Sequence, residues 1–193
     1  MQPQREKAFW DWFQANDARL YNFERDQEHT FDLLHTELVR VDKNLVFEFG
    51  PIENGRREFI ISADGIREAF PKVESLYAAA PALPRWKVVK FRPRREPMSI
   101  AFDGLRIDSD AVAVDLQHQG DKVELTMYLP GYSEHAEDKY KGIAFLFLDQ
   151  ALGEYDVETR VGHIELKARD EAPAHALSLA KLPTAFDKLL KPN

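Results

Sequence analysis

The sequence predicts an α+β fold, with a mostly antiparallel sheet and helices on one face. Residues 122–129 alternate between apolar and polar types, and Phe59, Ile61 and Ala63 alternate with Glu58, Ile60 and Ser62. This period of two is typical of half-buried strands. Residues 71–80 place apolar side chains at helical spacing. The same order of elements, β-hairpin, helix and strand, occurs in 44–92 and again in 111–167. The likeness is in element order and not in residue identity, so duplication and convergence both remain open.

The chain length of 193 residues suits one domain or two small, closely packed ones, and we expect a single compact domain, 1–193. Within it we expect four parts, which are N-terminal helices (1–42), a first ββαβ unit (43–95), a junction (96–110) and a second ββαβ unit with a terminal helix (111–193). There are no cysteines, which excludes disulfides, thiol catalysis and thiolate metal sites.

No apolar run approaches the ~18 residues that span a bilayer, and the N-terminus lacks the apolar region of a signal peptide. We therefore expect a cytoplasmic protein without a membrane partner. The net charge of −7 is unevenly spread, with −4 over 1–42, +4 over 43–106 and −7 over 107–193. Overall acidity makes nucleic acid an unlikely partner, whereas the basic middle keeps a small anionic ligand in view.

Two N-terminal helices are expected, over 4–24 and 27–42. The first contains four closely spaced aromatic residues and an interruption at Asn16-Asp17. One helix cannot turn all four inward, so we expect Trp10 to be partly exposed. In the second helix an apolar stripe recurs with helical period.

The first ββαβ unit contains clear local signals. Asn54-Gly55 is typical of a hairpin turn, and residues 57–63 run back as its second strand. Pro71 suits the first turn of a helix, where its missing N–H costs nothing. After Pro81 and Pro84, residues 86–92 form the closing strand.

The second unit begins with strands over 111–118 and 122–129. The helix over 134–152 should be the most buried one, because Ile143–Leu148 is a continuous apolar run. Gly153 is placed to end it. Residues 161–167 form the last strand, and Thr184-x-x-Asp187 resembles a capping box that starts a terminal helix.

Several segments resemble an uncharacterised bacterial protein family of unknown function: FEFGP, EFIISADGIREAFPKVESL, APALPRW, FRPR, LGEYDVET and LPTAFD. The resemblance covers most of the chain. It implies a bacterial, cytosolic protein and carries no assigned chemistry, so no functional residue is transferred from it.

Motifs for catalysis or cofactor binding were sought in the sequence. It has no glycine-rich dinucleotide loop, phosphate-binding loop, paired-histidine zinc helix or G-x-S-x-G elbow. The histidines are scattered, without ligand spacing. We therefore assign no catalytic residue, metal site or cofactor, and leave open whether the protein is an enzyme.

Strand alternation indicates where a binding site would lie. If Val89, Phe91 and Met127 face the helices, their neighbours face the opposite side of the sheet. We therefore predict that a ligand or partner contacts this open face, through Trp86, Lys90, Arg92, Tyr128 and His163. The alternative interpretation is a solvated face held by cross-strand charge pairs.

Three functional hypotheses follow. The first is a non-catalytic binding or regulatory protein that contacts a protein or small ligand through the open sheet face. The second is an enzyme with a motif-free site on the same face. The third is nucleic-acid binding through the basic strand 85–95, where Trp86 and Phe91 interleave with arginines and lysines as base-stacking side chains do.

Overall fold

The computed structural model describes residues 3–190, and its chain divides into two compact units, Met1–Arg92 and Pro93–Asn193. The division lies directly before Pro93, upstream of the expected junction at 96–110. Both units contain helices and a sheet, so the predicted α+β class is confirmed. Whether the two units unfold together as one domain stays a prediction. No helix among residues 3–190 is long and apolar enough to cross a membrane.

Unit 1 begins with helices that follow the sequence closely. The expected interruption near Asn16 separates the first two of them, and a 3₁₀ turn leads into the third. Their bounds are α1 (Pro3–Ala15), α2 (Asp17–Tyr21), the 3₁₀ turn (Phe23–Arg25) and α3 (Gln27–Val41).

Trp10 is 2% exposed, so the prediction that it is partly exposed is wrong. Its indole N–H donates to the carbonyl of Leu76 at 2.8 Å, in a helix that follows much later in the chain. The later helix that contains Leu76 covers this side of α1. Helix α1 therefore buries aromatic side chains on more than one face. Trp12 is the partly buried one.

The sheet of unit 1 has the order β1-β2-β3. The first two strands form the expected antiparallel hairpin, and Asn54 and Gly55 take positive φ at its turn. The third strand pairs parallel to β2, because α4 carries the chain back to the same end. The elements are β1 (Val46–Glu53), β2 (Arg56–Ser62), α4 (Phe70–Ala78) and β3 (Trp86–Lys90).

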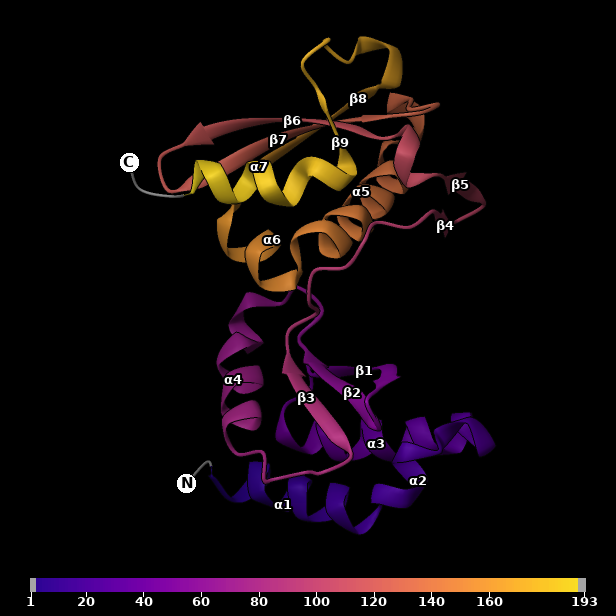
Figure 1. Ribbon diagram of the computed structural model, residues 1–193, viewed down its shortest axis with the longest axis vertical. Helices are drawn as coiled ribbons and strands as arrows, with labels where there is room; N and C mark the ends of the chain where they lie inside the picture. The colour runs from indigo at the N-terminus through magenta and orange to yellow at the C-terminus, as the bar shows by residue number, and fades with distance from the viewer. Residues whose placement is uncertain (1–2, 191–193) are drawn as a thin grey trace. The chain divides into compact units, whose positions relative to one another are not determined.

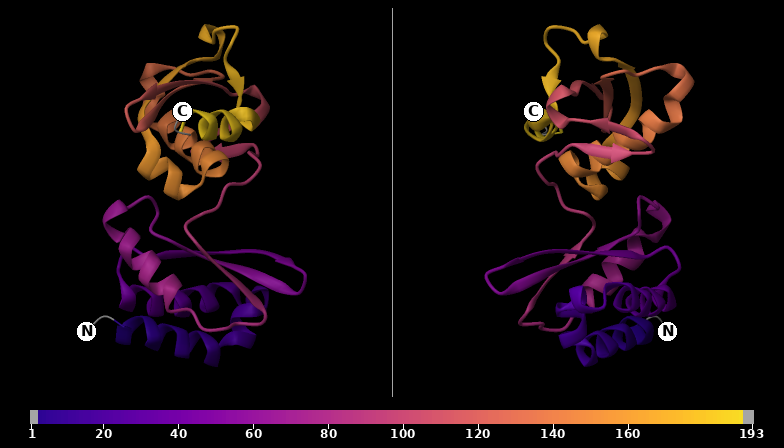
Figure 2. Two further views of the ribbon diagram at one scale, coloured as in Figure 1. Left: turned by 60° about the vertical axis from the view of Figure 1, so that its left-hand side comes forward. Right: turned by 90° about the vertical axis from the view of Figure 1, so that its right-hand side faces the viewer.

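All helices of unit 1 share one hydrophobic core with one face of this sheet. Figure 2 shows α1 and α3 on the same side of the sheet. From α4, Val73 and Leu76 are fully buried in that core. Pro71 stands in the first turn of α4, as predicted. Among residues 3–92, no helix lies on the opposite sheet face, and we call this face the open face of unit 1.

Strand β3 is one residue out of phase with the sequence prediction. Trp86 lies in the core, and Lys87, paired in register with Glu58, points to the open face. Phe91 returns to the core because it takes a left-handed conformation, with φ of 62°, which breaks the alternation at the strand end. Arg92 follows it on the open-face side, where it reaches Glu48.

Unit 2 contains a four-stranded sheet of order β8-β7-β6-β9 and a separate hairpin. The hairpin forms within the stretch expected to be an irregular junction, because Ile100 and Ile107 both join the core. The strands are β4 (Ile100–Phe102), β5 (Leu105–Ile107), β6 (Ala113–Gln119), β7 (Lys122–Leu129), β8 (Val161–Ala168) and β9 (Leu177–Ser178).

Three helices lie on one side of the unit 2 sheet (Figure 1). Gly153, with φ of 78°, ends the first of them as predicted. The second, and the short strand β9, were not anticipated. The last begins at Leu182 with Pro183 in its first turn, and not at a Thr184 cap. Their bounds are α5 (Glu137–Leu152), α6 (Glu154–Arg160) and α7 (Leu182–Leu189).

Helix α5 is less evenly buried than the continuous apolar run suggested. Phe147 and Leu148 are fully buried, whereas Phe145 is 47% and Leu146 41% exposed. The helical period turns two residues of any such run outward, and here only the hairpin beside α5 covers that side. Phe102 from this hairpin packs where a side chain at Gly142 would stand.

Arg94 fastens the first residues of unit 2 to its helices. Its guanidinium donates to the Leu152 carbonyl at 3.0 Å, to Asp187 at 2.9 Å and to Asp156 at 2.6 Å. The hydrogen bond to Asp187 raises the pKa of Arg94 despite partial burial. This arginine therefore holds the ends of α5, α6 and α7 together.

Candidate functional site

The residues predicted to form a site lie on two separate sheets. Trp86, Lys90 and Arg92 belong to unit 1, whereas Tyr128 and His163 belong to unit 2. The structure therefore does not bring the predicted set onto one sheet face.

Trp86 is 1% exposed, which contradicts its predicted place on the open face. Its ring packs edge-on against Phe13 at 4.9 Å between centroids. The indole N–H donates to Asp17 at 2.6 Å, so the one polar atom of the ring is satisfied inside the fold. Trp86 is a core residue.

Lys90 and Arg92 are both neutralised within unit 1. Lys90 pairs with Glu74 at 3.0 Å, and Arg92 pairs with Glu48 at 2.5 Å and Asp64 at 2.6 Å. Burial lowers the pKa of Arg92, but hydrogen bonds to Asp64 and Glu48 outweigh it and raise that pKa. The positive charge expected to attract an anion is therefore already matched by carboxylates.

Tyr128 lies on the side of its sheet away from the helices, as predicted, yet it is only 6% exposed. The crossover from β8 to β9, residues 169–176, passes over that side (Figure 1). It is held by Arg169, which donates to the Ala111 carbonyl, and by a His175–Asp115 contact of 3.2 Å. His163 is exposed on the edge strand β8.

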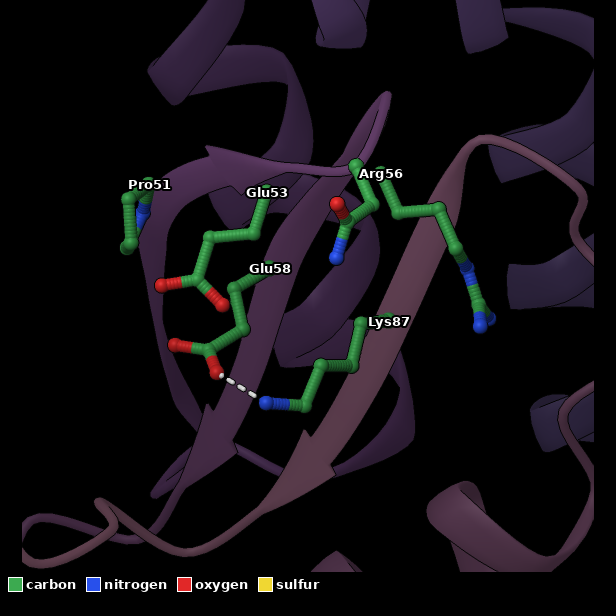
Figure 3. Close-up of a pocket in the computed structure, with 6 residues that line it drawn as sticks. Pro51, Glu53, Arg56, Glu58 and Lys87 are labelled. Carbon is green, nitrogen blue, oxygen red and sulfur yellow. Dashed lines mark hydrogen bonds and ion pairs between the residues drawn. The ribbon is translucent and has the colours of Figure 1, made fainter.

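The open face of unit 1 contains a hollow of about 260 Å³ at its hairpin end. The residues around it come from all three strands and from the hairpin turn. They are Pro51, Glu53, Asn54, Arg56, Glu58 and Lys87. Figure 3 shows the carboxylates of Glu53 and Glu58 turned to the same side of the sheet.

An ion pair of unequal partners forms one wall of the hollow. The ammonium of Lys87 contacts Glu58 at 2.9 Å, and the side chain of Glu58 is 8% exposed against 57% for Lys87. A buried carboxylate loses its hydration, so it requires a paired cation. The carboxylate of Glu58 is therefore held within the sheet, whereas the side chain of Lys87, which pairs with it, is largely exposed to solvent.

Gly50 makes room for that carboxylate. A Cβ atom built at Gly50 would stand 2.5 Å from Oε2 and 2.8 Å from Cβ of Glu58. No side chain fits at this position of β1 while Glu58 keeps its place. The strand register also shifts between Phe49 and Ile52, which adjusts β1 around the same point.

Arg56 lines the hollow, and its guanidinium forms a hydrogen bond to the backbone of β3. Its guanidinium reaches across β3 and donates to the carbonyl of Trp86, with Nε at 3.0 Å (Figure 3). The ionic side chains that line the hollow are Glu53, Arg56, Glu58 and Lys87. Their formal charges sum to zero.

Strand alternation in the sequence accounts for part of this site. The pairing of β1 with β2 places Glu48 and Glu58 on the open face, on the side of β2 opposite to Phe59 and Ile61. Lys87 was missed because the predicted phase of β3 was one residue off. The signal that could have found it is Trp86 itself, since a tryptophan at the start of a strand favours burial.

Comparisons with protein-family models, curated proteins and solved structures found no match to this chain. The resemblance to an uncharacterised bacterial family stays a prediction. Among residues 3–190, no three histidine or carboxylate side chains lie close enough together to hold a metal ion.

The ion pairs of the basic strand bear on nucleic-acid binding. Besides Lys90, Arg92 and Arg94, Arg85 pairs with Asp17 and Lys87 with Glu58. Phosphate contacts require cations that can exchange counterions for DNA, and carboxylates already occupy these.

We therefore expect no saturable binding of a fluorescently labelled DNA or RNA oligonucleotide at micromolar protein and roughly 0.15 M salt, measured by anisotropy. A steep salt-dependent affinity, lost when Lys90, Arg92 and Arg94 are neutralised together, would contradict this expectation.

Proposed function

We propose that this protein is a non-catalytic binding protein that holds a small ligand or a partner's side chain on the open face of unit 1. The hollow at the hairpin end is the centre of that site. The proposal rests on one observation. Glu58, whose side chain is nearly buried, lines a concave surface on the open face of unit 1.

Ligand sites are concave and contain a few fixed polar groups, and the hollow has both features. Its wall is built on paired strands, which position side chains more rigidly than loops do. Glu58 is immobilised by Gly50 on one side and Lys87 on the other. Among the residues described, the lining of the hollow contains no serine, threonine, cysteine or histidine, and recognition is the role that we propose for its charged groups.

The proposal is tested with isotope-labelled protein and a panel of small polar molecules that includes cations, anions, zwitterions and neutral compounds. Backbone amide shifts report where each one binds. We expect at least one compound to give saturable shifts concentrated in residues 51–58 and 86–89. A panel that leaves this region unchanged, or that shifts only another region, would refute the proposal.

A matched pair of variants separates site binding from general surface effects. Lys87→Ala removes the cation at the hollow, whereas Lys7→Ala removes one from an exposed helical ion pair with Asp11. We expect the first to change the affinity of the bound compound and the second to leave it unaltered. Equal effects from both variants would indicate nonspecific electrostatics.

A further inference from the structure

We propose that unit 2 forms a symmetric dimer with a second copy of this chain, in which the two β8 strands pair antiparallel about a two-fold axis at Leu166. The four-stranded sheets of the two copies then become one continuous sheet. This inference concerns unit 2, so it goes beyond the binding role proposed for unit 1 and does not depend on it.

The free edge of β8 is the first observation. Strand β8 stands at the end of its sheet and pairs parallel with β7 on one side. Among residues 3–190, no strand pairs with its other side. The register of β8 is regular over 164–168, after a shift near the start of the strand. An unpaired edge of this kind is a template for a further strand.

Charge complementarity selects the partner and the register. Opposite residues of an antiparallel pair lie on the same face of the sheet. A two-fold axis at Leu166 therefore sets Glu165 of each copy against Lys167 of the other. An axis at Glu165 or at Lys167 would set like charges directly opposite, which is destabilising. An axis at Ile164 would extend the pairing across the register shift.

The two charged side chains are accessible to a second copy. Glu165 is 48% and Lys167 is 37% exposed, and they pair within the strand at 3.1 Å. In the dimer each keeps this partner and gains a second partner of opposite sign across the axis. The four side chains then alternate in charge around a square, so the edge of β8 is complementary to itself.

The other face of β8 supplies the apolar part of the contact. In β7, Leu125 and Met127 are buried, whereas their partners Ile164 and Leu166 in β8 are only partly buried against the same core. Pairing about the axis brings Leu166 against its own copy and Ile164 beside Ala168 of the other copy. The second copy thus covers a core edge that a single chain leaves partly exposed.

Analytical ultracentrifugation of the full chain, from about 1 μM to about 500 μM, tests the proposal. The pairing is short, and small contacts give transient complexes. We therefore expect a reversible monomer–dimer equilibrium with a Kd on the order of 10–100 μM. A monomer over the whole range would overturn the proposal.

Charge reversal gives the sharper test. Glu165→Lys surrounds the axis with lysines and Lys167→Glu surrounds it with glutamates, so we expect each variant alone to raise the Kd by about tenfold. An equimolar mixture of the two variants should associate about as tightly as the parent protein, because the lysines of one chain then face the glutamates of the other.

The mixture separates the interface from the fold. Each variant chain keeps its like-charged neighbours within β8, so a repaired strand cannot explain restored association. Two weakened variants whose mixture stays weak, or two variants that dimerise like the parent, would overturn pairing at Leu166. Lys7→Glu, which makes the same change of net charge on an exposed helix of unit 1, is the control and should leave the Kd unaltered.

Each variant is accepted only if its circular dichroism spectrum matches that of the parent protein. Should a reversal fail that criterion, Glu165→Gln and Lys167→Gln are measured instead. These neutral variants lose the attraction across the axis without adding repulsion, so we expect a Kd raised by about threefold. An unchanged Kd for both would contradict the proposed register.

Discussion

Replacing Trp86 with alanine should lower the free energy of unfolding by about 3–5 kcal/mol, the range for large aromatic residues removed from a core. The side chain is 1% exposed and packs against Phe13 and Tyr21. Its removal also leaves Asp17 without the indole donor. Urea denaturation followed by far-ultraviolet circular dichroism measures the change.

Trp12→Ala is the control for this prediction, because Trp12 lies in the neighbouring helix α1 and is only partly buried. We expect its loss to cost markedly less. The loss of stability for Trp86→Phe should lie between the losses for Trp86→Ala and Trp12→Ala, because phenylalanine keeps most of the apolar contact but cannot donate the hydrogen bond to Asp17. A smaller loss for Trp86→Ala than for Trp12→Ala would contradict the core position of Trp86.

Phe147→Ala should destabilise the protein by about 3–5 kcal/mol, while Phe145→Ala should cost about 1 kcal/mol or less. The two residues have the same type and lie in the same helix, α5. Phe147 is fully buried, and Phe145 is 47% exposed. The comparison therefore isolates burial from helix propensity, and thermal or urea unfolding of both variants measures it.

This contrast also corrects the sequence prediction, in which Phe145 belonged to the buried run. Equal losses for the two variants would mean that α5 is covered on both sides. Losses below 1 kcal/mol at both positions would mean that α5 does not pack on the sheet.

Local chemistry predicted most element boundaries. Pro71 marks the start of α4, Asn54-Gly55 the hairpin turn and Gly153 the end of α5, and each acts through its own backbone. The orientation of whole elements depends on partners distant in sequence. Trp10 is buried because α4 lies against it, and no pattern within α1 contains that information.

The candidate site depended on the phase of one strand. Residues 86–90 contain two adjacent valines, so alternation fits either phase. In the structure, Trp86 faces the core, where its indole N–H donates to Asp17 in α2. Phe91 also contacts the core, because its left-handed backbone conformation turns its side chain to that face. In β2, by contrast, the side chains alternate without interruption, so the phase of Glu58 is not ambiguous in this way.

The closure of unit 1 by a parallel third strand has a consequence for synthesis on the ribosome. Every strand pairing of its sheet lies within Met1–Arg92, so the sheet is complete in sequence once β3 has left the exit tunnel. At roughly 5–20 residues per second, translation of the remaining chain takes several seconds, far longer than hairpin or helix formation. Unit 1 can thus fold while unit 2 is still being translated, and its apolar strands need not wait unpaired for the end of synthesis.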